Sequence, residues 1–260
     1  MGWTVGVDVG GTFTDFYAAN DQAGVFHVHK TSSTPSNPAE AILNGLDVMC
    51  AKFDIPTDEI ERVSHGTTVG TNALIQRTGS RVALVTTKGF RDLLEVGRQT
   101  RPHMYDLQRD HPAPLVDREY RIELNERIGA KGEIVRAPSA EDIDAAVDEV
   151  IAAAAGACAI GFVFSFRNDS HEQAFAKALR KRAPEIAVSV SSEVQPEFRE
   201  YERLSTTVLN AYLQPVMWHY LKTLEAGIAK LAPNASLGIN QSSGGLMSVQ
   251  RSREFPVRTA

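Results

Sequence analysis

The sequence has few cysteines, few aromatic residues and no excess of positive charge. Its two cysteines, Cys50 and Cys158, lie in apolar surroundings without metal-ligand spacing, so we expect free buried thiols in a reducing, cytoplasmic compartment. A net charge of -5 argues against general nucleic-acid binding, which requires clustered Lys and Arg. The uncharged stretch 150–166 divides better into a helix end and a buried strand than into a membrane span, so no membrane partner is expected.

Several common nucleotide-binding and catalytic motifs are also missing. The sequence has no Gly-Lys dipeptide and no Gly-x-Gly, which excludes a Walker A loop and a dinucleotide fingerprint. His171-Glu172 lacks the second histidine of a zinc-protease helix, and no Gly-x-Ser-x-Gly elbow occurs. Any nucleotide site must therefore be of another kind.

A glycine-tipped hairpin near the N-terminus is the most informative feature that is present. Apolar residues alternate over 3–9 and predict a half-buried strand, and a second strand follows over 13–19. Gly10 and Gly11 separate the two strands and predict a hairpin turn. Glycine lets the backbone approach a ligand and point bare N–H groups at an anion. The alternative is an ordinary Gly-Gly hairpin without a ligand.

Polar side chains surround this tip. Thr12 and Thr14 add hydroxyl donors, and Asp8 at the strand end is placed to hold a hydrated cation beside phosphates. Asp15 points to the strand face opposite Thr14, where a structural hydrogen bond is as reasonable as a contact to a cation. Together these residues predict a phosphate-binding loop.

A second polar cluster lies where a strand meets a helix. His65, Thr67, Thr68 and Asn72 occupy the position of a ligand crevice in α/β sheets, where they would hold a substrate carbonyl. An equally weighted alternative is a helix-capping turn with His65 as a satisfied core histidine.

The segment from Gln99 to Pro114 has no period and is rich in proline, arginine and histidine, so we interpret it as a functional loop. Arg98, Gln99 and Arg101 are candidates for bidentate contacts to a phosphate or carboxylate. Surface arginines in a connecting loop are the competing interpretation.

The predicted elements give an α/β chain. A β-meander over residues 3–30 is followed by alternating helices and strands up to 191, which implies βαβ units and a mixed sheet. A long helical region then runs from Pro196 to about Ala232, with Pro215 as a kink or break. We therefore expect a first domain over 1–195 and the beginning of a second over 196–260.

The motifs as a set resemble the start of the hydantoinase A, 5-oxoprolinase and acetone carboxylase β-subunit family. That family belongs to the sugar kinase, heat-shock ATPase and actin superfamily. The matching blocks are Asp-Val-Gly-Gly-Thr-Phe-Thr-Asp (8–15), His-Gly-Thr-Thr-Val-Gly-Thr-Asn-Ala-Leu (65–74), Val-Ala-Leu-Val-Thr-Thr-Lys-Gly-Phe-Arg-Asp (82–92), Gly-Arg-Gln (97–99), Leu-Asn-Ala-Tyr-Leu (209–213) and Gln-Ser-Ser-Gly-Gly-Leu-Met-Ser (241–248). The resemblance implies a ribonuclease-H-like lobe of the actin-like ATPase fold, followed by the start of a second lobe.

The resemblance also implies an activity, which is ATP-dependent ring opening of a hydantoin or 5-oxoproline type of substrate, as in N-methylhydantoinase. The alternatives are a ketone carboxylase subunit and a non-catalytic nucleotide-binding subunit. The implied cofactors are ATP with Mg²⁺ or Mn²⁺. By this resemblance Asp8 binds the cation through water, with a weaker contribution from Asp15. The implied phosphate contacts are Gly10, Gly11, Thr12, Phe13 and Thr14, and the implied catalytic residues are Asp8, His65, Thr67 and Thr68. The implied substrate contacts are Asn72, Arg98, Gln99 and Arg101.

The resemblance further implies a partner subunit of the hydantoinase B type. Relatives continue past residue 260 into a second glycine-rich loop, so we expect an amino-terminal fragment that is inactive alone. Apolar residues of the last helical region, such as Leu213, Trp218 and Leu221, are expected to be exposed and to favour a homo-oligomer.

Overall fold

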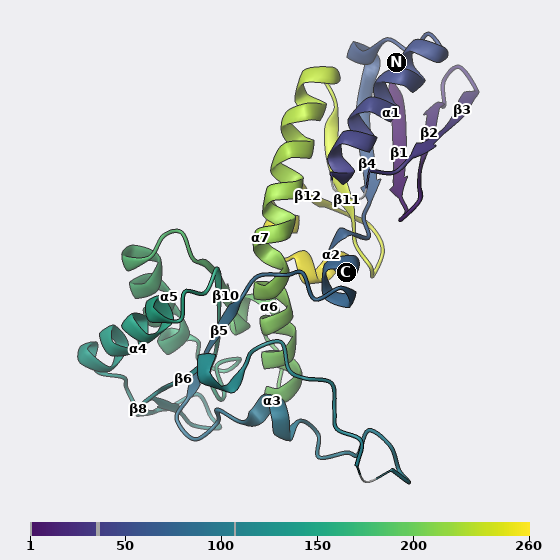
Figure 1. The fold of residues 1–260 in the computed structure, drawn as a ribbon. Coiled ribbons are helices and arrows are strands. Elements are labelled where there is room, and N and C mark those ends of the chain that lie inside the picture. The colour runs from purple at the N-terminus through teal and green to yellow at the C-terminus, as the bar shows by residue number, and fades with distance from the viewer. Residues whose placement is uncertain (1, 35–36, 107) are drawn as a thin grey trace. The chain divides into compact units, whose positions relative to one another are not determined.

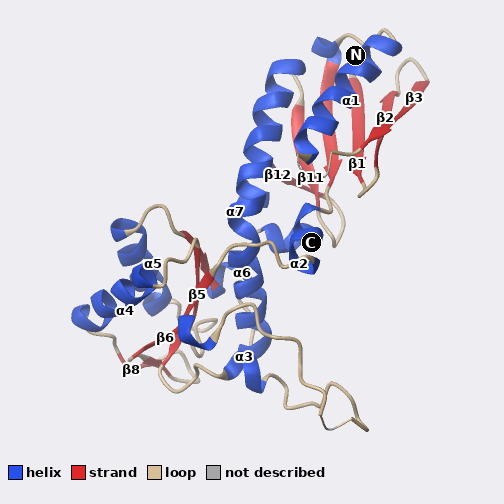
Figure 2. Ribbon diagram, viewed as in Figure 1, coloured by secondary structure: helices blue, strands red, loops and turns tan. Residues whose placement is uncertain are grey.

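The computed structural model describes residues 2–34, 37–106 and 108–260. The chain divides into two compact units, one made of residues 1–78 with 216–260 and the other of residues 79–215. Figures 1 and 2 show a sheet with attached helices in each unit. Each unit is described by itself.

The first unit is built on a six-stranded mixed sheet in the order β12-β11-β4-β1-β2-β3. The first three strands form a meander, and β4 and β11 run parallel to β1. Its strands are β1 (Trp3–Val9), β2 (Phe13–Asn20), β3 (Val25–Ser32), β4 (Ile60–Gly66), β11 (Ser236–Asn240) and β12 (Leu246–Ser248).

The alternating sequence of β1 gives this sheet one covered face and one open face. Val5, Val7 and Val9 are buried, and the side chains between them face the open side. Helix α1 (Pro38–Lys52) packs on β1, β2 and β3 (Figure 1). A Cβ at Gly45 of α1 would lie 2.4 Å from the ring of Phe16, so glycine is required for this close approach. The parity of β1 therefore decides which side chains stay accessible.

The remaining helical elements of the first unit are shorter, apart from the C-terminal half of α7. They are η1 (Thr57–Glu59), α2 (Val69–Ile75), α7 (Glu200–Leu231, of which residues 216–231 belong here), α8 (Val249–Glu254) and η3 (Pro256–Thr259).

The second unit contains a four-stranded parallel sheet in the order β10-β9-β5-β6. Every residue of β5 and β9 is buried, which explains their continuous apolar runs. The elements are β5 (Val82–Thr87), α3 (Leu93–Val96), η2 (Arg118–Tyr120), β6 (Arg121–Leu124), β7 (Arg127–Ile128), β8 (Ile134–Arg136), α4 (Ala140–Ala152), β9 (Ala157–Gly161), α5 (Ser170–Arg182), β10 (Ala187–Val190), α6 (Ser191–Val194) and residues 200–215 of α7. Helix α4 starts with the capping box of Ser139 and Asp142.

The alternation of elements suggests that residues up to 191 complete the lobe that carries the glycine-tipped hairpin. The structure shows that they do not. Strand β11 returns to pair with β4, with Ile239 opposite His65, and residues 79–215 form the separate second unit. The ribonuclease-H-like sheet is therefore interrupted in sequence. The division between 195 and 196 stays a prediction about sequence families and does not coincide with the compact units.

Several local expectations are corrected. Helix α7 continues through Pro215, because Leu213 and Met217 on either side are fully buried and their packing outweighs one missing backbone hydrogen bond. Leu213 and Leu221 are fully buried, which corrects the expectation for them, whereas Trp218 is 47% exposed as expected. At the start of α1 the sequence Asn37-Pro38-Ala39-Glu40 is typical of a capping box, but Asn37 makes no side-chain cap bond. Among the described residues, no helix combines the length and apolarity needed to cross a membrane.

Candidate functional site

The tip of the β1–β2 hairpin is held by Ser33, which directly follows β3. The N–H of Gly10 donates to the carbonyl of Phe13 at 2.9 Å, and a Cβ at Gly10 would lie 3.1 Å from the same oxygen. Ser33 donates its hydroxyl to the Gly10 carbonyl at 2.8 Å and its N–H to the Thr12 carbonyl at 2.9 Å. Apart from Gly11 and its two chain neighbours, no atom of the described residues lies within 4 Å of a Cβ built on Gly11, so a ligand has open access to that backbone. The tip is thus fixed on one side and open on the other.

The predicted phosphate contacts have different surroundings. Thr12 is exposed at the tip, and Phe13 is 46% exposed with the Lys30 ammonium 4.9 Å from its ring centre. Thr14 is fully buried, and its hydroxyl lies 2.9 Å from that of Ser33. In this geometry Thr14 supports the loop, while Thr12 is the threonine that faces solvent.

A row of polar groups lies on the open face at the carboxyl ends of β1, β4 and β11. Asp8 is exposed and stands directly opposite Asp15 in the β1–β2 register, and Lys30 pairs with Asp15 at 3.0 Å. Asp8 also lies beside Gly66 of β4. A Cβ at Gly66 would lie 3.3 Å from Asp8 Oδ1 and 3.6 Å from the amide nitrogen of Asn240. The absence of a side chain at residue 66 therefore leaves room beside the carboxylate.

This row fits a hydrated divalent cation that is bound together with phosphates. Two carboxylates placed directly opposite each other repel, and Lys30 neutralises only Asp15. Within the described ranges, no three or more His, Cys, Asp or Glu side chains gather as metal ligands. A cation beside Asp8 would therefore complete its coordination shell with water and phosphate oxygens, which are the usual ligands of Mg²⁺ at such sites.

A cavity of about 690 Å³ lies behind the hairpin tip in the first unit. Its wall includes the tip, the start of α2 and one side of α7, and Asp8 is not among the residues that form it. Thr68 donates its hydroxyl to the Val9 carbonyl at 3.1 Å, and Asn72 donates to Thr68 at 3.4 Å. The lining residues are Val9, Gly10, Gly11, Ser33, Thr34, Asn37, Pro38, Thr68, Val69, Asn72, Ala73, Gln76, Thr78, Val216, His219, Tyr220 and Thr223.

His65 lies on the covered face of the sheet, opposite Val7, and is fully buried. Burial lowers the pKa of His65 to about 4, and a backbone hydrogen bond to Val7 opposes this shift. In the neutral ring Nδ1 donates to the Val7 carbonyl at 3.3 Å, and Nε2 accepts from the hydroxyl of Tyr220. Burial raises the pKa of Tyr220, while a hydrogen bond to Thr67 acts in the opposite direction. His65 is a satisfied core histidine and does not share a sheet face with Asp8.

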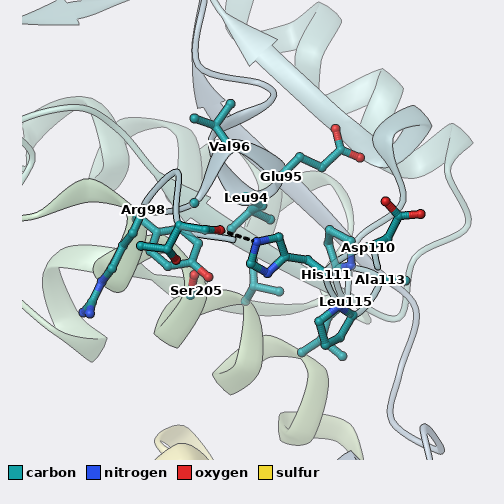
Figure 3. A pocket seen from close by; sticks show the side chains of 15 residues that line it. Leu94, Glu95, Val96, Arg98, Asp110, His111, Ala113, Leu115 and Ser205 are labelled. Carbon is teal, nitrogen blue, oxygen red and sulfur yellow. Dashed lines mark hydrogen bonds between the residues drawn. The ribbon is translucent and has the colours of Figure 1, made fainter. Parts of the chain in front are cut away.

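The predicted contacts around Arg98 belong to the second unit. Arg98 is held by Glu202, with Nε 2.6 Å from the carboxylate, and Gln99 has a left-handed backbone with φ of 56°. Figure 3 shows the neighbouring hollow of about 800 Å³, where His111 donates to the Thr100 carbonyl at 2.7 Å. Arg101 is exposed. The segment is irregular as expected, with residue 107 outside the described residues.

The sequence interpretation missed three residues that shape these sites, namely Ser33, Tyr220 and Asn240. Asn240 is the last residue of β11, in the same way that Asp8 lies near the end of β1, so its position at a strand end is the signal that could have indicated it. Ser33 and Tyr220 act through contacts between segments that are distant in sequence, and no local sequence pattern predicts these contacts.

The sheet order, the parallel β1, β4 and β11, and the glycine-tipped hairpin with its carboxylate define the first lobe of an actin-like ATPase. Within that class the chain belongs to the hydantoinase/oxoprolinase family. The model of the hydantoinase/oxoprolinase N-terminal region matches residues 4–183, and that of hydantoinase/oxoprolinase matches residues 203–260. The family and the fold class expected from the sequence are confirmed.

The chain is 38% identical to caprolactamase subunit alpha of Pseudomonas jessenii over 250 residues, which cover 94% of this chain and 36% of that protein. It is 32% identical to the acetophenone carboxylase gamma subunit of Aromatoleum aromaticum over 261 residues, covering 93% of this chain and 35% of that protein. The crystal structure of the ATP-dependent caprolactamase from Pseudomonas jessenii matches with a TM-score of 0.85 and 37% identity, over 95% of this chain and 36% of that chain. The chain thus spans little more than a third of the length of these relatives.

Proposed function

We propose that the protein uses ATP to open a cyclic amide by phosphorylating the carbonyl oxygen. The observation that carries the proposal is the Asp8 carboxylate beside the open Gly66 and the exposed glycine tip, in a chain related to an ATP-dependent caprolactamase. An amide is a poor electrophile, and transfer of the γ-phosphoryl group converts its oxygen into part of a leaving group. Water then adds at the ring carbon, and the C–N bond breaks to leave a free amine and an acyl phosphate. A second water attacks the acyl carbon, so that the original carbonyl oxygen departs with the phosphate and the product is the amino acid.

The proposed roles follow the geometry. Asp8 positions Mg²⁺ through water and Asp15 contributes less, because Lys30 already neutralises it. The backbone of Gly10 and Gly11, with Thr12, contacts phosphates, and this electrostatic positioning is most of what phosphoryl transfer requires.

The remaining predicted residues take supporting or peripheral roles in the proposal. Phe13 shields the tip, and Thr14 holds it from inside. Thr68 and Asn72 present polar groups in the cavity behind the tip, while Thr67 and His65 act by positioning Tyr220.

Substrate contacts of Arg98, Gln99 and Arg101 remain part of the proposal. Arg98 would have to exchange Glu202 for a substrate carboxylate, whereas Gln99 and Arg101 are exposed. We further propose a hydantoinase B type of partner subunit and self-association, since two relatives are named as subunits. A cytoplasmic location is supported by two free, buried thiols.

The second candidate function is ATP-dependent carboxylation of a ketone. It is favoured by 32% identity to the acetophenone carboxylase gamma subunit. The ATP step is shared, because a phosphorylated enol is formed from a ketone as a phosphorylated imidate is formed from a lactam.

The deciding experiment measures phosphate release by the complete enzyme that contains this chain, with ATP and Mg²⁺. Release that depends on a lactam supports the first function, and dependence on both ketone and bicarbonate supports the second. With a lactam labelled by ¹⁸O at the carbonyl, the label should appear in the phosphate. Label retained entirely in the amino acid would contradict departure of the carbonyl oxygen with the phosphate.

A further inference from the structure

The second unit contains a hollow of about 210 Å³ near the carboxyl ends of β5 and β6. These ends belong to two neighbouring parallel strands, which is where α/β sheets bind ligands. The hollow is lined by Lys88, Asn125, Glu126, Arg127, Val135 and Arg136. It has three cationic side chains and one carboxylate.

The carboxylate of Glu126 does not neutralise those cations. Its side chain is fully buried, and its two oxygens accept from the hydroxyl of Thr87 and from Nδ1 of His171, the latter at 2.7 Å. No ion pair joins Lys88, Arg127 or Arg136 to any carboxylate in the part of the chain that the structure describes. The hollow is therefore positively charged.

Two of the cations stand in an unfavourable register. Arg127 of β7 and Arg136 of β8 are direct cross-strand partners in a two-stranded ribbon. Like charges placed directly opposite each other destabilise a strand pair. Arg127 lies over the ring of Phe90 at 5.2 Å, and Arg136 donates to Asn125 Oδ1 at 2.8 Å, so neither contact removes the charge.

The backbone next to Lys88 and Arg127 is held by hydrogen bonds. Lys88 donates its N–H to the Leu124 carbonyl at 2.9 Å, which joins the two strand ends. Thr87 and Glu126, the sequence neighbours of Lys88 and Arg127, are locked in the buried hydrogen-bond network. A preorganised group of guanidinium and ammonium donors around a small hollow is the arrangement that binds oxyanions.

We propose that this hollow binds a small oxyanion, of the phosphate or carboxylate class, between Lys88, Arg127 and Arg136. Bidentate contacts from the two guanidinium groups would neutralise the cross-strand repulsion, and Lys88 would add a point charge. The proposal is independent of the phosphate loop, because every residue involved lies in the second unit.

The test is calorimetric titration of the full chain with inorganic phosphate against chloride at equal ionic strength, with bicarbonate and acetate as separate arms. Arg136→Gln should weaken phosphate binding at least about tenfold, because it removes one bidentate donor. Lys131→Gln is the matched control, since it removes one positive charge from the same hairpin outside the hollow, and its affinity should stay within about twofold. The ranking of the three anions identifies the source, with a doubly charged phosphate preferred over acetate if phosphate is the ligand.

A thermal melt supplies an independent readout. In chloride alone Arg136→Gln should melt at least about 1 °C above the wild type, because a like-charge pair is removed. In phosphate the order should reverse. Equal phosphate affinity of wild type and Arg136→Gln would overturn the proposal and leave the glycine tip as the anion site, and so would an equal loss in Lys131→Gln.

Discussion

Each unit contains a pair of cross-strand neighbours with the same charge, and the sign of that charge differs between the units. In the first unit the pair is acidic, with Asp8 facing Asp15, and in the second it is basic, with Arg127 facing Arg136. Lys30 offsets one carboxylate of the acidic pair, whereas the basic pair has no such partner among the described residues. The acidic pair suits a cation bound with phosphates, and the basic pair suits an anion. Repulsion between like charges on neighbouring strands is thus found at both candidate sites, although the sites would bind ions of different charge.

The supports of the two pairs differ as well. The hairpin tip of the first unit is held by the neutral hydroxyl of Ser33. In the second unit the buried carboxylate of Glu126 holds Thr87 and His171. Removing a buried ionic side chain costs more stability than removing a neutral one, because its buried hydrogen-bond partners then have no water molecules to bind instead. Activity is therefore the sensitive readout for the first unit and stability for the second.

The largest effect is expected for Asp8→Ala. In the complete enzyme, removal of the carboxylate that positions the cation should reduce ATP turnover at least about a thousandfold with the fold unchanged. Phosphate release and circular dichroism measure the two quantities. Asp15→Asn should lose about tenfold or less, because Lys30 already pairs with that carboxylate. Asp21→Ala, in the exposed turn after β2, is the control. Near-normal turnover of Asp8→Ala would remove Asp8 from the site.

Glu126→Ala should destabilise the second unit by about 3–4 kcal/mol, because it removes the acceptor of the Thr87 hydroxyl and of His171 Nδ1 and opens a cavity. Urea unfolding followed by circular dichroism measures the change. Glu185→Ala removes a carboxylate from an exposed position and should change stability by less than about 0.5 kcal/mol. If both variants unfold at the same urea concentration, the buried network does not support the strand ends.

His65 predicts a pH dependence of the first unit. Its pKa is lowered by burial from 6.5 to about 4 in the folded state. Between these values the unfolded chain binds a proton that the folded chain does not, so stability is full above pH 6.5 and falls as the pH drops toward 4. The total is about 3 kcal/mol at most.

Unfolding by urea at pH 7, 6 and 5 tests this dependence by the difference between wild type and His65→Gln. The variant should lose less stability over this range, whatever its stability at pH 7. Tyr220→Phe keeps the imidazole and should keep most of the slope. Parallel profiles for wild type and His65→Gln would mean that the folded protein accepts the proton without cost.

The elements of both units that depend on local pattern were predictable from the sequence. The strands of the hairpin follow from alternation, and the uncharged stretch 150–166 contains a helix end and a buried strand, as predicted. The return of β11 to β4 was not predictable, because it pairs Leu237 with Val63 across a separately folded unit and no local period encodes it. The family resemblance supplied the fold class but not this interruption.

The candidate site was predictable to a similar degree. Asp8 and the glycine tip were found from their place at a strand end. The burial of Thr14 was implied by the parity of the strand, since it stands opposite Val9 in the hairpin. The sheet face of His65 was not predicted, because the sequence analysis placed this residue where a strand meets a helix and did not extend the side-chain alternation of the strand to it. Tyr220 donates to His65 across 155 positions of sequence, beyond any short-range rule.

The smallest effect concerns the space beside Asp8. Gly66→Ala places a methyl group about 3.3 Å from Asp8 Oδ1, which is closer than an ordinary van der Waals contact and forces the carboxylate or its neighbour to shift. A displaced water or cation at this point should weaken Mg²⁺-ATP binding about tenfold, measured by titration calorimetry, with a smaller change in thermal stability. Gly6→Ala is the matched control on the same open face of β1, because its nearest contact would be 3.9 Å away at the Tyr17 carbonyl, so binding should be unchanged. If both variants bind Mg²⁺-ATP as tightly as the wild type, neither the nucleotide nor its cation occupies the space beside Asp8.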